Sequence, residues 1–123
     1  MKKLLTKLLA LLALAVSAPL FAASVSMTSP STGALYLAPA TLPVKANASA
    51  PGATVTQVEF FANGVSIGVD TTSPYQFDWT APAAGTYSIT AVVTDSNGAT
   101  ATSAAHTITV ALRQWRLVIR NFR

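Results

Sequence analysis

Residues 58–70 read VEFFANGVSIGVD, and the fold follows from this stretch. Apolar and polar residues alternate before the dipeptide Asn63-Gly64 and again after it. Both central residues of a type I′ turn need a positive φ angle, which makes Asn-Gly a strong hairpin signal between alternating segments. The stretch therefore predicts two antiparallel strands, each with one buried face and one wet face.

The same two-residue period continues on both sides of this hairpin. Such alternation is typical of antiparallel sheets that pack face to face, and residues 24–110 show no helical periodicity. We therefore predict an all-β fold, an immunoglobulin-like antiparallel β-sandwich of about seven strands, preceded by a helical signal peptide. The predicted strands lie within residues 24–29, 42–48, 55–62, 65–69, 75–79, 87–94 and 99–110.

The largest side chains of these strands are expected to have structural roles. Phe60, Phe77 and Trp79 are predicted to fill the core, each contributing about 1.5–3 kcal/mol on burial. Tyr87 begins a strand after a loop, where a tyrosine-corner hydroxyl bonds back to the backbone. Disulfide-containing immunoglobulin domains have a cysteine two residues later, but Ile89 stands there and the chain has no cysteine. Packing must therefore replace the bridge.

Several separated motifs together resemble the bacterial immunoglobulin-like domain family. They are residues 58–64 with 67–68, then 72–79, 83–91 and 95–98, in this order and spacing. The resemblance covers residues 24–110. It implies a sandwich with an accessory role in an exported bacterial protein, as a repeat or spacer beside glycoside hydrolase or adhesin domains. It implies no catalytic residues.

Residues 1–23 have the pattern of an export signal. Lysines in the first seven residues precede an apolar run, Leu8–Val16, and Pro19 then breaks the predicted helix. A helix of this length would span roughly 14 Å, about half of a bilayer core, so an uncleaved membrane anchor is the weaker alternative. We predict cleavage after Ala22 rather than Ala23, and a protein that is secreted, periplasmic or at the cell surface.

The positive charge of the chain is concentrated at its ends. The formal net charge is +4, yet Lys45 is the only base between residues 24 and 111, against Glu59, Asp70, Asp78 and Asp95. That segment has a net charge of 1 − 4 = −3. Nucleic-acid binding needs basic groups clustered on a folded face, so we exclude it.

The residues that most often carry catalysis do not form a recognisable constellation. His106 is the only histidine, the four acids lie on different segments, and there is no Gly-x-Ser-x-Gly motif or glycine-rich phosphate loop. Asp95 opens the turn Asp95-Ser96-Asn97-Gly98, which lacks the later glutamate of an EF-hand loop. At such a position an aspartate more often bonds nearby backbone N–H groups. We predict no enzyme, no cofactor and no metal.

Phe61 is a candidate interaction residue. It is adjacent to Phe60, so in a regular strand the two rings point to opposite faces. If Phe60 is in the core, Phe61 either is partly exposed, where it can stack on a sugar or anchor a neighbouring domain, or packs in a small cluster beneath a loop. Ordinary packing favours the cluster.

The C-terminal tail, residues 111–123, differs sharply from the rest. It contains four arginines, whereas residues 1–112 contain none. On a helix, Arg113, Arg116 and Arg120 would share one face with Arg123, beside Trp115 and other apolar residues, a pattern that suits an anionic surface or a partner groove. A strand is another reading. The alternative we favour is a segment outside any folded unit, from a shifted reading frame or the end of a fragment of a longer multidomain protein.

We therefore expect a non-catalytic exported module that acts as a spacer, scaffold or protein-interaction domain. One alternative is a carbohydrate-binding or adhesive module that uses exposed aromatic residues, and another is membrane-surface association through the basic tail. The expected partner is a protein or a cell-surface polysaccharide. We expect a monomer, no nucleic acid, and membrane contact only through the signal peptide before cleavage.

Overall fold

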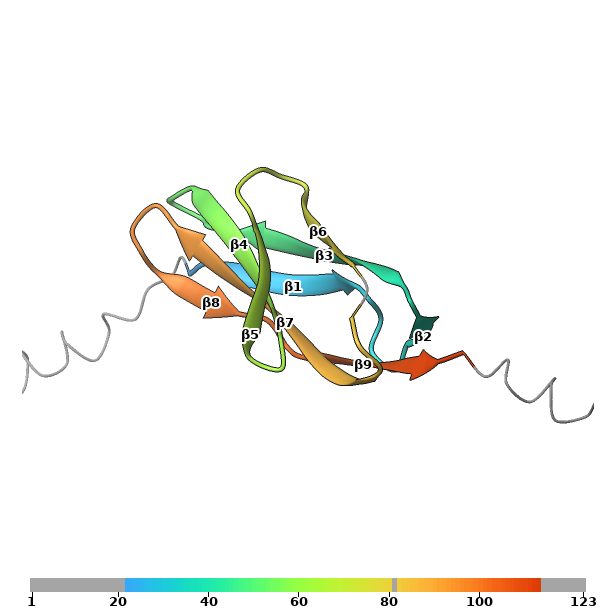
Figure 1. Cartoon of the computed structure of the whole chain (residues 1–123). Coiled ribbons are helices and arrows are strands. Elements are labelled where there is room, and N and C mark those ends of the chain that lie inside the picture. The colour runs from blue at the N-terminus through green and yellow to red at the C-terminus, as the bar shows by residue number, and fades with distance from the viewer. Residues whose placement is uncertain (1–21, 81, 114–123) are drawn as a thin grey trace, which may run out of the picture.

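A computed structural model describes residues 22–80 and 82–113, and this part of the chain is all β. The predicted signal peptide lies outside the described residues except for Ala22 and Ala23. Nine strands follow in chain order (Figure 1): β1 (Ser24–Ser29), β2 (Leu35–Ala38), β3 (Thr41–Ser49), β4 (Val55–Ala62), β5 (Val65–Asp70), β6 (Tyr75–Thr80), β7 (Gly85–Asp95), β8 (Thr100–Thr102) and β9 (His106–Leu112).

The strands form two sheets, which confirms the predicted sandwich. The smaller sheet has the order β1-β3-β6, and the larger has the order β2-β9-β7-β4-β5, with β8 also paired to β7. All neighbours are antiparallel except β2 and β9, which run in parallel. Two details differ from the sequence prediction: β2 was not predicted, and the stretch 99–110 forms two strands instead of one.

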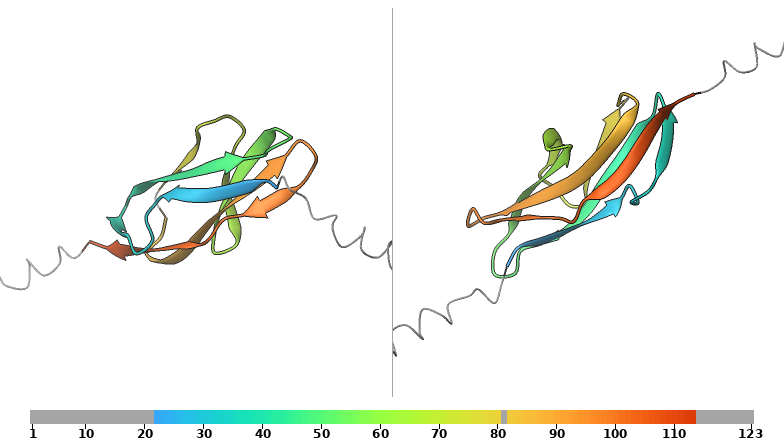
Figure 2. Two further views of the ribbon diagram at one scale, coloured as in Figure 1. Left: turned by 180° about the vertical axis from the view of Figure 1, so that it is seen from behind. Right: turned by 90° about the horizontal axis from the view of Figure 1, so that it is seen from below.

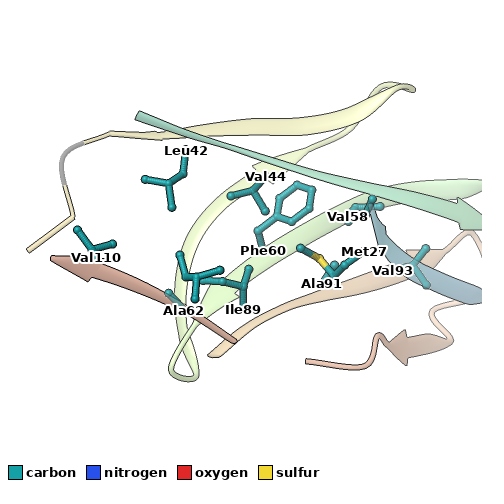
Figure 3. Close-up of a cluster of buried hydrophobic side chains, with 12 residues drawn as sticks. Met27, Leu42, Val44, Val58, Phe60, Ala62, Ile89, Ala91, Val93 and Val110 are labelled. Atoms are coloured by element: carbon teal, nitrogen blue, oxygen red, sulfur yellow. The ribbon is translucent and has the colours of Figure 1, made fainter. Parts of the chain in front are cut away.

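The core lies between the sheets and is built from the inward-facing residues of both (Figure 3). Phe60 is its largest fully buried side chain, as predicted, and burial of such a ring contributes about 1.5–3 kcal/mol. Phe77 and Trp79 pack against the core, but they are only half-buried, so the prediction that they fill the core holds only in part. They lie on β6, an edge strand of the smaller sheet. Because β6 has no neighbouring strand on one side, its inward-facing residues are less covered there. The twelve buried apolar residues are Met27, Leu42, Val44, Ala46, Val58, Phe60, Ala62, Ile89, Ala91, Val93, Ile108 and Val110.

The hairpin between β4 and β5 has the predicted turn. Asn63 has a φ angle of 51° and Gly64 one of 79°, as a type I′ turn requires. The pairing then shifts, since Phe60 lies opposite Gly68 whereas Phe61 lies opposite Ser66. The extra residue forms a bulge in β5, a feature that twists an edge strand away from unwanted pairing.

The tyrosine corner is also confirmed. The Tyr87 hydroxyl donates a 2.6 Å hydrogen bond to the Ala83 carbonyl, four residues earlier. The Tyr87 ring meets Trp79 edge to face, with ring centroids 4.9 Å apart and planes at 86°. Ile89, at the position where related folds have a cysteine, is fully buried. The tyrosine corner and the Trp79–Tyr87 ring contact join the two sheets without a disulfide.

The sandwich is elongated, and the two ends of the chain lie at its opposite ends. In Figure 1, β1 begins at one end and β9 leaves the domain at the other, and both views of Figure 2 show the same arrangement. A chain that passes through this domain therefore enters and leaves at opposite poles.

Candidate functional site

Phe61 lies on the outer face of the larger sheet. It is half-buried, and it is neither in the core cluster nor packed against it. Its partners across the sheet are Ser66 on β5 and Thr90 on β7. The ring is therefore flanked by strand residues of its own face, and the predicted cluster beneath a loop stays a prediction.

Hydroxyl residues are frequent on this face of the sheet, and two of them, Ser66 and Thr90, lie beside Phe61. The outward positions of β7, β8 and β9 carry threonine or serine, except for Val92 and Ala111. The nearest charge is that of Glu59, whose Oε2 accepts a 2.6 Å hydrogen bond from the Ser66 hydroxyl. The lysine and arginine among the described residues, Lys45 and Arg113, do not belong to the strands of this sheet. The surface therefore suits a neutral, polyhydroxylated ligand better than a charged one. Its hydroxyl residues are Ser66, Thr86, Ser88, Thr90, Thr94, Thr100, Thr102, Thr107 and Thr109.

The structure does not bring the predicted tail residues to Phe61. Arg113 is exposed and follows β9 directly. Phe61 pairs with Thr90 near the middle of β7, whereas Val110 pairs with Gly85, the first residue of that strand. Arg113, which follows Val110 by three residues, therefore lies beyond the end of β7, away from Phe61. Trp115, Arg116 and Arg120 lie outside the described residues.

A row of half-buried aromatic residues was missed as a candidate surface. Tyr75, Phe77 and Trp79 alternate along β6, and all three pack partly against the core. Residues two apart on a strand are separated by about 6.6 Å, so the row is continuous. The alternation in the sequence predicts a shared face, but it does not show that β6 is an edge strand with that face partly open.

His106 has the structural role expected of a lone histidine. It is half-buried at the start of β9, and its Nδ1 lies 2.8 Å from the Pro30 carbonyl oxygen. A carbonyl oxygen can only accept, so Nδ1 carries the proton and donates it. This bond ties β9 to the segment that connects β1 and β2.

Asp70 joins the two sheets through its carboxylate. Oδ1 accepts hydrogen bonds from the backbone N–H of Thr72 at 3.1 Å and from the Thr72 hydroxyl at 3.3 Å. Oδ2 accepts one at 2.9 Å from the backbone N–H of Gln76 on β6. The Gln76 N–H, followed by that of Thr72, lowers the pKa of Asp70 below its ordinary value, because each bond favours the ionised form.

Asp95 has the turn-forming role that was predicted. Its Oδ1 accepts hydrogen bonds from the backbone N–H groups of Asn97 and Ala99, at 2.9 and 3.0 Å. The carboxylate is thus engaged with its own turn. In the part of the chain that the structure describes, no three His, Cys, Asp or Glu side chains are grouped so that they could hold a metal ion.

A shallow hollow lies over the paired ends of β1 and β3. Its volume is about 200 Å³ and its lining is small and uncharged: Ser24, Val25, Ser26, Asn47, Ala48 and Ser49. These side chains offer hydroxyl and amide groups but no general base or acid.

Within residues 22–80 and 82–113 there is no helix that could cross a membrane.

Comparison with known sequences identifies the class of this domain. The sequence profile described as "Bacterial Ig domain" matches residues 24–91, from the first residue of β1 into β7. The chain therefore belongs to the bacterial Ig domain family. No curated protein matches the chain.

Solved structures support the same fold. The chain resembles a structure of the fibronectin(III)-like modules of CbhA from Clostridium thermocellum, with 30% identity and a TM-score of 0.68. The match covers 72% of this chain and 96% of that one. An engineered protein is also similar, at 23% identity and a TM-score of 0.51, over 73% of this chain and 20% of that one. The second likeness concerns the fold alone.

Proposed function

We propose that this chain is an exported, non-catalytic spacer or scaffold module that keeps the partners of its two poles at a fixed separation. Bacterial Ig-like domains are typical of extracellular or periplasmic proteins, which agrees with the export signal expected from residues 1–23. The module with which the chain shares 30% identity corresponds to almost the whole of this sandwich.

The observation that carries this proposal is the position of the two ends. β1 begins at one pole and β9 leaves at the other, so the full length of the sandwich separates the two ends of the domain (Figure 1). The eleven residues of β7 rise about 3.3 Å each, so the long dimension is roughly 36 Å. The interior between the sheets is filled with apolar side chains, and such a core resists deformation.

The chemistry of the described residues supports a role without catalysis. The one histidine is bonded to a backbone carbonyl, and the carboxylates of Asp70 and Asp95 are bonded to backbone N–H groups. Nucleophilic catalysis needs a nucleophile beside a base that a third group orients. The Ser66 hydroxyl is bonded to the Glu59 carboxylate, but this is an exposed pair that bridges the neighbouring strands β4 and β5. The hydrogen bonds of these side chains serve turns and connections instead.

A second candidate function is binding of a neutral polysaccharide on the outer face of the larger sheet. The observation that favours it is Phe61, an aromatic ring on an open sheet face among hydroxyl groups. Membrane-surface association through the tail is a third possibility, and of that tail only the exposed Arg113 and its two predecessors are described.

Titration distinguishes these functions. A spacer should give no chemical-shift change at Phe61, Ser66 or Thr90 with soluble neutral polysaccharides at millimolar sugar. Saturable shifts confined to these residues would replace the spacer proposal with the second candidate. For the tail, anionic vesicles should sediment the full chain no better than a chain that ends at residue 110, and stronger sedimentation of the full chain would support the third possibility.

A further inference from the structure

We propose that Asn97 is a site of spontaneous deamidation, and that the fold spares Asn63, which belongs to the same dipeptide. Asn-Gly occurs twice in the chain, at 63–64 and at 97–98. Both dipeptides lie in exposed turns between antiparallel strands, the first between β4 and β5 and the second between β7 and β8 (Figure 1). The dipeptide alone therefore makes the two sites equivalent, and only the structure distinguishes them.

The reaction needs no enzyme, and water is its only co-reactant. The backbone nitrogen of the glycine attacks Cγ of the asparagine side chain, and the new carbon–nitrogen bond closes a succinimide ring. The bond from Cγ to Nδ2 breaks, and Nδ2 leaves as ammonia with the proton of the glycine N–H. Water then opens the ring at either carbonyl, which gives aspartate or isoaspartate. Glycine favours the attack because it has no side chain to crowd the nitrogen.

The fold holds the side chain of Asn63 against this reaction. Its Oδ1 accepts from the Ser88 N–H at 2.8 Å, and its Nδ2 donates to the Thr86 carbonyl at 3.3 Å. Attack of the Gly64 nitrogen at Cγ converts the planar amide into a tetrahedral centre and expels Nδ2. Both bonds to β7 must therefore be given up before the ring can close, which raises the barrier at Asn63.

The side chain of Asn97 has no such anchorage. It is exposed, and within residues 22–80 and 82–113 its amide group makes no hydrogen bond. The attacking nitrogen, that of Gly98, donates to the Asp95 carbonyl at 3.0 Å. That bond belongs to a short exposed turn, and such turns open locally at a small cost in free energy. Ring closure at Asn97 therefore meets less resistance than ring closure at Asn63.

Isoaspartate at position 97 opens the turn that joins β7 to β8. In isoaspartate the chain runs through the side chain, so an extra carbon separates residue 97 from Gly98. The bonds that close the turn cross this insertion. Asp95 accepts from the Gly98 N–H at its carbonyl and from the Ala99 N–H at Oδ1, both at 3.0 Å, and its own N–H donates to the Ala99 carbonyl at 2.9 Å. Since β8 begins at Thr100 and pairs with β7 alone, it loses its support first.

Peptide mapping of the full chain, incubated in mildly alkaline buffer, tests the site. One sample stays folded and the other is unfolded in urea, and mass spectrometry follows deamidation at each dipeptide separately. In urea the two rates should be similar, because both asparagines precede glycine. In the folded chain Asn97 should react about tenfold faster than Asn63 or more, because two hydrogen bonds to β7 suppress ring closure at Asn63.

Two results would overturn the proposal. One is a ratio of the two rates that is no larger in the folded chain than in urea. The other is an Asn97 that stays intact in the folded chain for as long as the unfolded chain takes to react. Neither result depends on a variant that must fold.

Hydrogen exchange tests the consequence for β8. The isoaspartate form, separated from the unreacted chain, should lose protection at the amides of residues 99–102 while β4 keeps its own. The matched control is Asn97→Gln, incubated in parallel, because its longer side chain would have to close a larger ring. Equal loss of protection in the control would contradict the assignment to Asn97. The spacer function stands or falls separately, since it depends on the separation of the ends.

Discussion

The Phe77 ring lies directly over Gly68, across the gap between the two sheets. A Cβ atom built on Gly68 would lie 2.5 Å from Cδ2 of Phe77 and 2.7 Å from Cγ and Cε2. Gly68 has no positive φ angle, unlike the other glycines of the described chain, so its role is to admit the ring. This contact brings the edge strands β5 and β6 together at one side of the sandwich.

Substitution of this glycine tests the contact. We expect Gly68→Ala to lower the free energy of unfolding by about 1–3 kcal/mol, the usual cost of overpacking. In a Phe77→Leu background the added methyl group meets a smaller side chain, so the same substitution should cost clearly less. Chemical denaturation of the four chains measures this coupling, and additive effects would show that the two residues do not compete for space.

Asn63 has a second role beyond the turn. Its Oδ1 accepts from the Ser88 N–H at 2.8 Å, and its Nδ2 donates to the Thr86 carbonyl at 3.3 Å. Asn63→Gly keeps the turn geometry but loses both bonds, so we expect about 1–2 kcal/mol of destabilisation. Asn63→Asp keeps the acceptor and should lose less. If Asn63→Gly is as stable as the native chain in thermal unfolding, the side-chain bonds contribute nothing.

Asp70 should make the free energy of unfolding depend on pH in the acidic range. Its pKa is lowered in the folded state, so its contribution is present above the ordinary pKa and is lost as pH falls through the folded one. Asp70→Asn should therefore cost about 1 kcal/mol at pH 7, and this difference should begin to shrink below about pH 4 and be lost below the lowered pKa of the folded state. Urea unfolding from pH 7 to pH 2.5 measures this, and a constant difference across that range would contradict the role of the carboxylate.

The sequence pattern predicts the sandwich well where apolar alternation is long and turns have distinctive residues, as in 55–70. It does not predict β2, because the apolar Leu35 and Leu37 are exposed and Tyr36 between them is half-buried, which reverses the usual relation of apolar character to burial. This strand is held by its pairing with β9, and a contact between residues so distant in sequence leaves no local signal.

The break between β8 and β9 has a similar origin. Ser103 interrupts the alternation and is buried, because its hydroxyl accepts from the Ala91 N–H at 3.0 Å and donates to the Ala104 carbonyl at 2.9 Å. The sequence around Ser103 gives no sign that this serine is buried and bonded to the backbone of β7. The outward orientation of Phe61 could be predicted from its adjacency to Phe60, but the hydroxyl groups beside it come from strands whose register only the fold defines.

Phe61 offers a direct comparison of the two candidate functions. We expect Phe61→Ser to lower the free energy of unfolding by about 1 kcal/mol or less, as for a cross-strand pair on an open face. Phe60→Ala, in the core, should cost about 3–5 kcal/mol. Val69→Ser, also on the outer face, is the matched control for polysaccharide titration by calorimetry. Binding that is lost in Phe61→Ser but kept in Val69→Ser would favour the carbohydrate role.

The separation of the two ends tests the spacer most directly. Spin labels on Ser24→Cys and Arg113→Cys in the full chain report their distance by pulsed electron resonance. The account predicts one narrow distribution centred at about 40 Å, in keeping with the rise of a strand that spans the sandwich, and unchanged by polysaccharide or anionic vesicles. A broad distribution, or one that shifts when either is added, would contradict a spacer of fixed length.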